Sequence, residues 1–347
     1  MDAKAKSPFS IAFGKKPNEY ISRVRDENEI IDAFMSESTN AYMISGVRGS
    51  GKTVLLSDIA NRLDEEGWVV VELNPTTDMR MSLASKLYNK ENFTKDFINA
   101  KLNLSLLGIG MTIENSPPIS DIDTATEKML KVLKKKEKKL LVVVDEVTNN
   151  REMRQFASSF QMFIRSGFQI YLLMTGLYNN LRKLQNDDEI TFLLRTPQII
   201  LEPLRLSSIK KSYKDALGIG EEIAEEMAKL TRGYAYAYQV LGYLYWKEQP
   251  GENINHILPE YDAYLYDYVY DKIWAELSEN DKMVAKAIAE HGGNAAVNVI
   301  REELDMSDKY FSVYRDRAKK KGIIDTSTYA KLSFSLPRFE EYVIDRS

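Results

Sequence analysis

The chain has 347 residues, of which 44% are hydrophobic and 28% charged, and its net charge is −4. This length exceeds that of one compact core, so we expect two or three domains, and the charge balance gives no reason for a general affinity for nucleic acid. The sequence has no cysteine and only two distant histidines, which excludes a disulfide framework, a zinc ribbon and a thiol nucleophile and argues against a His-rich metal site or a Ser-His-Asp triad.

The first two-thirds of the sequence alternate between short apolar strands and amphipathic helices. Strands are expected at 40–45, 68–73, 140–144, 169–174 and 198–201, and helices at 52–63, 124–133 and 151–165. This alternation predicts a parallel sheet with helices on both faces. The continuously apolar strand at 140–144 suits a sheet that is buried on both sides. An extra β-hairpin is expected at 102–113, between the second and third strands of the sheet.

After residue 204 the strand signals stop and helices follow one another. They are expected at 206–217, 221–230, 235–246, around 261–277, and at 280–290, 297–303 and 308–321. A strand comes last, in which Leu332, Phe334 and Leu336 share one face. Three helices followed by a β-hairpin is the pattern of a winged helix-turn-helix. The longest apolar runs fall well short of the roughly 20 residues that span a bilayer, so we expect a cytoplasmic protein without a membrane contact.

The strongest motif is the segment Gly46-Val-Arg-Gly-Ser-Gly51-Lys52-Thr53, which follows a predicted strand and opens a predicted helix. In this context the pattern GxxxxGK[ST] predicts a phosphate-binding loop, because glycines let backbone N–H groups surround phosphates at a helix N-terminus. Lys52 supplies a positive charge, and the Thr53 hydroxyl is placed to bind Mg²⁺. The residues expected to hold the nucleotide are Gly46, Arg48, Gly49, Ser50, Gly51, Lys52, Thr53 and Val54. The alternative is a glycine-rich turn without a ligand.

An acidic pair, Asp145-Glu146, follows the apolar strand at 140–144 and fits a Walker B motif. Asp145 is expected to hold Mg²⁺ and Glu146 to orient and polarise the attacking water. The alternative is a pair of solvated acids at the start of a loop. Together with the phosphate loop, this pair predicts an ATP hydrolase that depends on Mg²⁺.

Two further residues are candidates for the reaction. Thr175 ends the next strand, where a polar side chain can contact the γ-phosphate or the attacking water; the alternative is that it caps the helix that follows. Arg195 precedes the last strand, where ring or dimer ATPases place an arginine that reaches a neighbouring subunit's nucleotide. The alternative for Arg195 is a surface arginine paired with one of the acids at 187–189.

Taken together, these motifs resemble those of AAA+ ATPases related to archaeal and origin-recognition initiators, and of ATP-binding proteins near the STAND signalling ATPases. The matching stretches span nearly the whole chain and lie at 13–17, 46–55, 142–147, 175–177, 191–195, 233–242 and 336–339. The resemblance implies a P-loop αβα core at 1–203, a small helical lid at 204–250, and a linker helix with a winged helix-turn-helix at 251–347. It also implies ATP as the ligand, with the segment from Pro17 to Arg25 near the adenine, and leaves a homo-oligomer or a partner protein open.

One position departs from the initiator pattern. Initiators carry a sensor arginine at the start of the last lid helix, whereas this chain has Gly233-Tyr234-Ala235-Tyr236 there and its nearest arginine is Arg232. The lid is therefore expected to contact the nucleotide through backbone or tyrosine groups rather than through a guanidinium.

The segment 307–321 is the candidate recognition helix for double-stranded DNA. Ser307 is expected to cap it, and Phe311, Tyr314 and Ala318 to face inward. The residues expected to be free for phosphates are Lys309, Arg315, Arg317 and Lys320, with Lys331 on the wing. The alternative is a solvated face whose basic residues stabilise the helix C-terminus.

Two functions follow from these observations. The first is an ATP-driven conformational switch whose winged helix contacts DNA or a partner protein. The second is a STAND-like module that holds ATP or ADP with little turnover and does not bind DNA.

Overall fold

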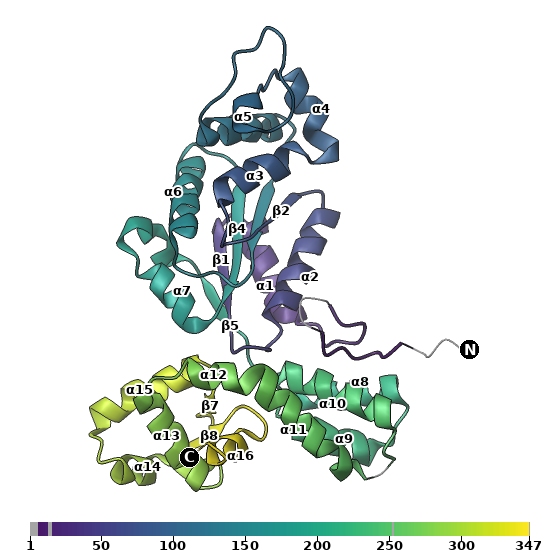
Figure 1. The fold of residues 1–347 in the computed structure, drawn as a ribbon, viewed down its shortest axis with the longest axis vertical. Coiled ribbons are helices and arrows are strands. Elements are labelled where there is room, and N and C mark those ends of the chain that lie inside the picture. The colour runs from purple at the N-terminus through teal and green to yellow at the C-terminus, as the bar shows by residue number, and fades with distance from the viewer. Residues whose placement is uncertain (1–5, 13–15, 252, 347) are drawn as a thin grey trace. The chain divides into compact units, whose positions relative to one another are not determined.

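The computed structural model describes residues 6–12, 16–251 and 253–346 (Figure 1). They form two compact units. The core unit consists of Arg23–Ser45 and Lys52–Ile199. The C-terminal unit consists of Gly46–Gly51 and the described parts of Met1–Ser22 and Ile200–Ser347. The tip of the phosphate loop therefore belongs to the C-terminal unit, although the chain on either side of it belongs to the core unit.

A five-stranded sheet organises the core unit. Its strands are β1 (Ala41–Ser45), β2 (Val69–Leu73), β3 (Leu140–Val144), β4 (Ile170–Gly176) and β5 (Gln198–Ile200), in the order β2-β3-β4-β1-β5. The pairs β2·β3, β3·β4 and β4·β1 are parallel. Every residue of β1, β3 and β4 is buried, as a sheet covered on both faces requires. The predicted parallel sheet is confirmed.

Helices cover both sides of this sheet (Figure 1). They are α1 (Val24–Met35), α2 (Lys52–Glu65), α3 (Met79–Tyr88), α4 (Glu91–Asn99), α5 (Ile122–Lys135), α6 (Arg151–Arg165) and α7 (Tyr178–Gln185), with short 3₁₀ segments η1 (Ser105–Leu107) and η2 (Asp188–Arg195). Local capping fixes several starts: Asp121 accepts a hydrogen bond from the Thr124 N–H to begin α5, and Asn150 does the same with Met153 for α6.

The β-hairpin predicted at 102–113 is wrong, since this segment contains only η1 and turns. Its apolar side chains are core residues: Leu104 and Ile109 are buried among helices rather than on a strand. Gly108 and Gly110 both have positive φ angles, which break the extended geometry that pairing needs. The Asn103 side chain, which donates to the Ser116 carbonyl at 3.0 Å, replaces part of the missing backbone pairing.

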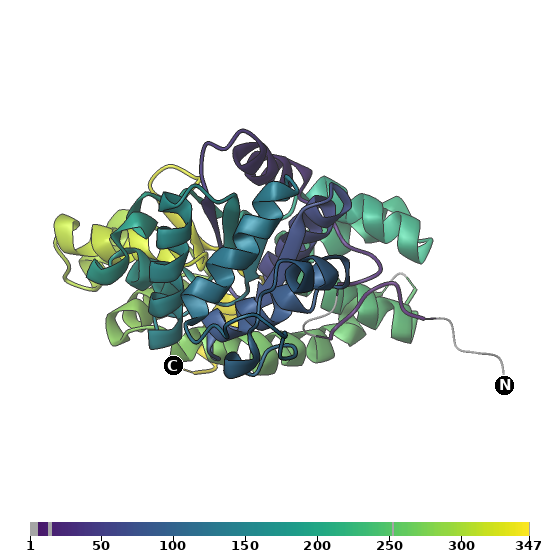
Figure 2. The same cartoon turned by 90° about the horizontal axis from the view of Figure 1, so that it is seen from above.

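The C-terminal unit begins with the helices α8 (Leu206–Leu217), α9 (Glu221–Leu230) and α10 (Ala235–Glu248), called here the lid helices. The segment η3 (Ile254–Ile257) follows, then a linker helix made of α11 (Leu258–Leu265), the π-helical turn η4 (Tyr266–Tyr270) and α12 (Asp271–Ala275). In both views the lid helices and the last elements of the chain occupy opposite ends of this unit (Figures 1 and 2).

The last elements form a winged helix. They are α13 (Glu279–Glu290), β6 (Asn294–Ala296), α14 (Val297–Glu303), α15 (Asp308–Lys320), β7 (Ile324–Asp325), β8 (Lys331–Phe334) and α16 (Phe339–Ile344). The strands pair antiparallel in the order β6-β8-β7. The apolar faces predicted for α15 (Phe311, Tyr314, Ala318) and for the wing (Leu332, Phe334, Leu336) are buried, and Ser307 caps α15.

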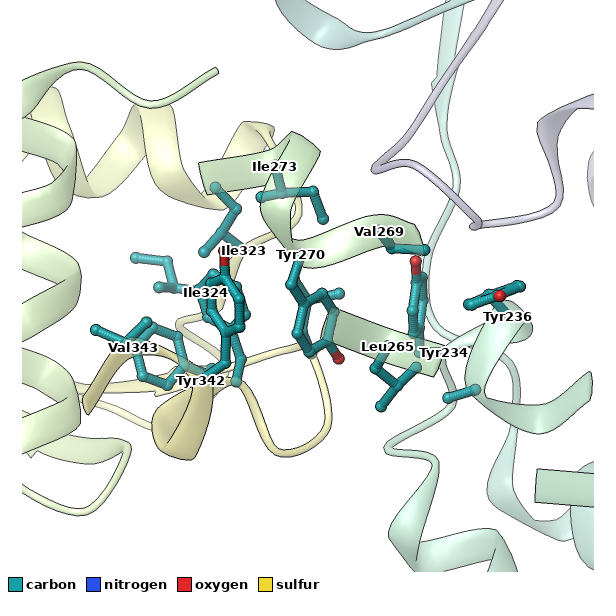
Figure 3. Close-up of a cluster of buried hydrophobic side chains, with 14 of the residues drawn as sticks. Tyr234, Tyr236, Leu265, Val269, Tyr270, Ile273, Ile323, Ile324, Tyr342 and Val343 are labelled. Carbon is teal, nitrogen blue, oxygen red and sulfur yellow. The ribbon is translucent and has the colours of Figure 1, made fainter. Parts of the chain in front are cut away.

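A single hydrophobic core joins the lid helices to the winged helix. It runs from Tyr234 and Tyr236 past Tyr270 to Tyr342 (Figure 3). The expected packing face of the linker helix is only partly right, because Tyr261 is fully buried whereas Tyr268 is 50% exposed. The π-helical turn explains the difference, since an added residue rotates every later side chain around the helix axis. Within the described ranges, no helix has the length and apolarity needed to traverse a lipid bilayer.

Candidate nucleotide-binding site

The phosphate loop connects the end of β1 at Ser45 to the start of α2 at Lys52. Gly49 and Gly51 have φ angles of +70° and +93°, which an L-residue with a Cβ rarely adopts. Lys52 is buried at 7% exposure at the first turn of α2, where a helix N-terminus favours an anion. The local backbone therefore has the strand, loop and helix arrangement that the motif requires.

The two residues expected to bind Mg²⁺ are in direct contact within the core unit. The Thr53 hydroxyl donates to Asp145 Oδ2 at 2.8 Å. Neighbouring oxygens on an octahedral Mg²⁺ lie about 2.9 Å apart, given metal–oxygen distances near 2.1 Å. A hydroxyl and a carboxylate oxygen at this separation are a donor set that fits the ion.

Thr175 fixes the acidic pair from the neighbouring strand. Its hydroxyl donates to Asp145 Oδ1 and accepts a hydrogen bond from the Glu146 N–H at 3.0 Å. Its carbonyl accepts from the Val147 N–H at 2.8 Å. This arrangement follows from the sheet, because Val144 pairs with Met174 and the next residues on the two strands therefore meet. Both oxygens of Asp145 are thus held, one by Thr53 and one by Thr175.

Glu146 has a left-handed backbone conformation, with φ at +53°. This conformation is uncommon for a residue with a Cβ and costs about 1–2 kcal/mol. The hydrogen bonds from its N–H to Thr175 and to Asp145 Oδ1, at 3.0 and 3.1 Å, hold the strained peptide in place. The side chain itself is exposed. The turn therefore directs the Glu146 side chain to solvent at the carboxyl end of the sheet.

The alternatives weighed for Thr175 and Arg195 are both wrong. The residue at the N-cap of α7 is Leu177, so Thr175 does not cap that helix. Arg195 is exposed and, within the part of the chain that the structure describes, has no ion pair with the acids at 187–189. Instead, Arg154 lies within 4 Å of Asp187 and Glu189. The roles of Thr175 as a phosphate sensor and of Arg195 in a neighbouring subunit stay predictions.

The tip of the loop makes contacts that the sequence did not suggest, all of them inside the C-terminal unit. Nε and Nη2 of Arg48 donate to Glu276 Oε1 at 3.0 and 2.7 Å. The Tyr234 hydroxyl donates to the Arg48 carbonyl at 2.6 Å. No pattern in the sequence could have revealed these pairs, because the partners are 186 and 228 residues apart.

Arg232, the arginine nearest to the initiators' sensor position, is engaged elsewhere. It pairs with Glu340 of α16 at 2.5 Å and donates to the Leu336 carbonyl at 3.1 Å. This finding agrees with the expectation that no lid guanidinium serves the nucleotide.

The segment expected near the adenine is described only in part, because Phe13 and Gly14 lie outside the described residues. Pro17 is half-buried in the N-terminal segment of the C-terminal unit. Arg25 is exposed in the first turn of α1, in the core unit. Their role toward the adenine stays a prediction.

The basic residues of the candidate recognition helix differ in their surroundings. Lys309, Lys320 and Lys331 are exposed, and Arg315 lies 3.4 Å from the neighbouring Asp316. Arg317 instead lies 3.5 Å from the buried Asp281.

Asp281 also accepts a hydrogen bond from Lys321 at 2.9 Å. Burial raises the pKa of this carboxyl, but the bonds from Lys321 and Ser278 outweigh burial and leave the pKa below its usual value. Part of the basic cluster therefore stabilises the fold.

Comparison with known proteins agrees with this geometry. Residues 20–192 match a family model described as an ATPase domain predominantly from Archaea. Residues 267–343 match a model described as a domain of unknown function. Among curated proteins, none matches the sequence. The segment that contains Lys52, the acidic pair and Thr175 is therefore an archaeal-type ATPase domain.

The fold of the whole chain is similar to that of solved ATPases. A Walker-type ATPase of Pyrococcus abyssi is 15% identical, with a TM-score of 0.66 over 93% of this chain and 96% of that one. The ORC2 protein of Aeropyrum pernix, solved in ADPNP-ADP complexes, is 12% identical, with a TM-score of 0.59 over 97% of this chain and 96% of that one. At these identities the likeness shows the fold: an AAA-type α/β core, a helical region and a C-terminal winged helix. The resemblance to the archaeal and origin-recognition group is confirmed.

Proposed function

We propose that this protein is a Mg²⁺-dependent ATP hydrolase that works as a conformational switch. The observation that carries the proposal is the acidic pair. Asp145 is held at both oxygens by Thr53 and Thr175, and Glu146 is held in a strained turn that leaves its carboxylate exposed. Strain at such a position is a feature of functional sites more often than of structural turns.

The residues divide the work of hydrolysis among themselves. Backbone N–H groups of the loop and the Lys52 ammonium bind the β- and γ-phosphates. Thr53 and Asp145 hold Mg²⁺, which when bound neutralises charge on the phosphate oxygens. Glu146 orients a water toward the γ-phosphorus and accepts its proton as the new P–O bond forms and the bond to the β–γ bridging oxygen breaks. Thr175 is the candidate sensor for the γ-phosphate.

Steady-state hydrolysis and nucleotide binding test this assignment. The wild type should release phosphate from ATP only with Mg²⁺. Lys52→Ala should lose binding or turnover, and Glu146→Gln should keep binding and lose turnover, because the amide has the shape of the acid without its basicity. Turnover by Glu146→Gln at the wild-type rate would remove Glu146 from its role.

The proposed output is the C-terminal unit. The loop tip Gly46–Gly51 belongs to that unit, and the same hydrophobic core extends from the lid helices to the winged helix. ATP binding is thus proposed to change the state of the winged helix, which contacts double-stranded DNA or a partner protein. Lys309, Arg315, Lys320 and Lys331 are the proposed DNA contacts, and Arg317 is a weaker candidate because it faces Asp281.

A second function remains in competition: a STAND-like module that holds ATP or ADP with little turnover. The pairing of Arg232 with Glu340 favours it, because that arginine links the lid to the winged helix rather than facing a nucleotide. Turnover that rises with DNA and with protein concentration favours the switch. Tightly bound nucleotide with negligible turnover in every condition favours the module.

Arg195 is proposed to act in a second protomer. Its exposed side chain, without an ion pair among the described residues, is available for such a contact. Arg195→Ala and Glu146→Gln proteins should each be inactive alone, and a mixture should regain turnover, because each supplies what the other lacks. No recovery in the mixture would leave Arg195 without a role in trans.

A further inference from the structure

The phosphate loop is held on its outer side by the lid and the linker helix, a feature that the proposed hydrolysis does not use. The Tyr234 hydroxyl donates to the Arg48 carbonyl at 2.6 Å, and the Tyr236 N–H donates to the Gly49 carbonyl at 3.0 Å. Tyr234 is the N-cap residue of α10 and is 4% exposed. Two consecutive peptide carbonyls of the loop are therefore held by the first residues of one helix.

The chemistry of these contacts suits an anion-binding loop. A phosphate needs hydrogen-bond donors, and the loop supplies them from its peptide N–H groups. Carbonyl oxygens repel a phosphate, so the loop must direct them elsewhere. Because Tyr234 and Tyr236 supply donors for the carbonyls of Arg48 and Gly49, they fix the orientation of the two peptides that these carbonyls terminate.

Gly49 is a second, independent sign that this contact is close. The pattern GxxxxGK[ST] requires glycine at positions 46 and 51 but not at 49. A Cβ on Gly49 would lie 2.4 Å from the Tyr234 hydroxyl oxygen and 2.8 Å from Tyr236 Cβ. The approach of the lid, together with a φ of +70°, accounts for glycine here.

The side chain of Arg48 adds a third contact, to Glu276 at the C-cap of α12. The two side chains are 32% and 41% exposed, so the pair is partly screened by solvent and is worth at most about 1 kcal/mol. Its value is geometric: the guanidinium uses two nitrogens on one carboxylate oxygen, which restricts the direction of the loop tip.

We propose that Tyr234 and Glu276 are positioning residues for phosphate binding. They hold the carbonyl side of the loop so that its N–H groups are set for the β-phosphate before nucleotide arrives. This inference rests on the proposed nucleotide binding. It assigns to the lid a tyrosine contact with the loop in place of the guanidinium contact with the nucleotide that initiators use.

Tyr234→Phe tests the first residue, because it deletes only the hydroxyl. The matched control is Tyr270→Phe, since the Tyr270 hydroxyl also donates to a backbone carbonyl, that of Pro337, at 2.6 Å, and both rings lie in the same core (Figure 3). Each variant should lose similar thermal stability without nucleotide. Only Tyr234→Phe should bind ADP and ATP about 3- to 10-fold more weakly, the loss expected for one hydrogen bond.

The readouts separate this inference from the proposed function. Binding is measured with a fluorescent ADP analogue and Mg²⁺, with Lys52→Ala as the reference for a lost phosphate site. If the wild type binds no nucleotide, the proposed function fails. If the wild type binds, Lys52→Ala does not, and Tyr234→Phe binds as tightly as Tyr270→Phe, only the positioning role is refuted.

A double-mutant cycle tests Glu276. Arg48→Ala and Glu276→Ala should each weaken ADP binding about 2- to 5-fold, and the double variant no further, because both remove the same pair. An additional loss from Arg48→Ala in the Glu276→Ala background would mean that Arg48 contacts the nucleotide itself, and would overturn the role of Glu276.

Discussion

Glu146 should hold its left-handed conformation at the expense of stability, and replacing it by glycine should release that strain. At +53°, its φ is one that Cβ makes costly by about 1–2 kcal/mol, whereas glycine adopts it freely. Glycine also gains freedom in the unfolded chain, which offsets about 0.4–1 kcal/mol of the benefit. The exposed side chain of Glu146 has no printed hydrogen bond or ion pair with the described residues, so little else is lost. The net expectation is a stabilisation of about 0.5–1 kcal/mol.

Chemical denaturation and thermal melting measure this effect in the protein without nucleotide. A gain of this size corresponds to a rise of about 1–4 °C in melting temperature for a unit of this length. Turnover should be lost at the same time, because glycine has no carboxylate. Glu146→Gln should lose turnover without gaining stability, since it retains the Cβ.

Glu137 provides a matched control. It has φ at +55°, is exposed, and follows α5 at a distance in sequence from every site residue. Glu137→Gly should stabilise the protein as much as Glu146→Gly does and leave turnover unchanged. A Glu146→Gly protein that is less stable than Glu146→Gln would refute the reasoning, because the turn would then not be strained.

Three further perturbations follow from contacts described above. Thr175→Val should destabilise the core unit by about 1–3 kcal/mol in denaturant titrations, since it leaves buried partners without their hydroxyl, and Thr175→Ser should restore most of the loss. Lys321→Met should cost about 3 kcal/mol by leaving the buried Asp281 with a weaker partner, and a loss under 1 kcal/mol would contradict the burial of that pair. The folded-state pKa of Asp281 lies below its unfolded value, so its contribution is present above about pH 4 and lost as the pH falls through the folded pKa; the stability of Asp281→Asn should therefore depend less on pH in that acidic range. Replacing Arg315 and Lys331 by alanine should lower the salt dependence of duplex DNA binding by about one unit of slope each, and an unchanged slope would exclude them as phosphate contacts.

Local patterns were sufficient for the parts of the fold that depend on neighbours in sequence. The strands at 140–144 and 198–201 could be recognised from apolar runs, and Ser307 from its place before an amphipathic helix. The phosphate loop and the acidic pair could be recognised because their chemistry needs fixed spacings. The segment 102–113 misled because its apolar residues pack as irregular chain, and hydrophobicity alone does not distinguish that from a strand.

Contacts between distant residues could not be predicted in this way. Thr175 was recognised as a site residue, but its bonds to Asp145 and Glu146 follow from the placement of β4 beside β3, which the sequence does not state. The contact of Tyr234 with Arg48 depends on the path of the whole C-terminal unit. The buried Asp281 was missed for the same reason, because its basic partners are 36 and 40 residues further along the chain.

The π-helical turn at Tyr266–Tyr270 makes the linker helix sensitive to its length as well as to its composition. Asp267 is an exposed residue of this turn, so the chain can lose it without removing a buried side chain. The shortened helix would close into regular α geometry, and everything after it would turn by about 100° and advance by about 1.5 Å. Glu276 would then face away from Arg48 with no side chain at either position altered. A frame-preserving deletion of one codon is thus enough to separate the loop from the linker helix, and changes in length within this turn are a route by which related chains can diverge in how nucleotide reaches the winged helix.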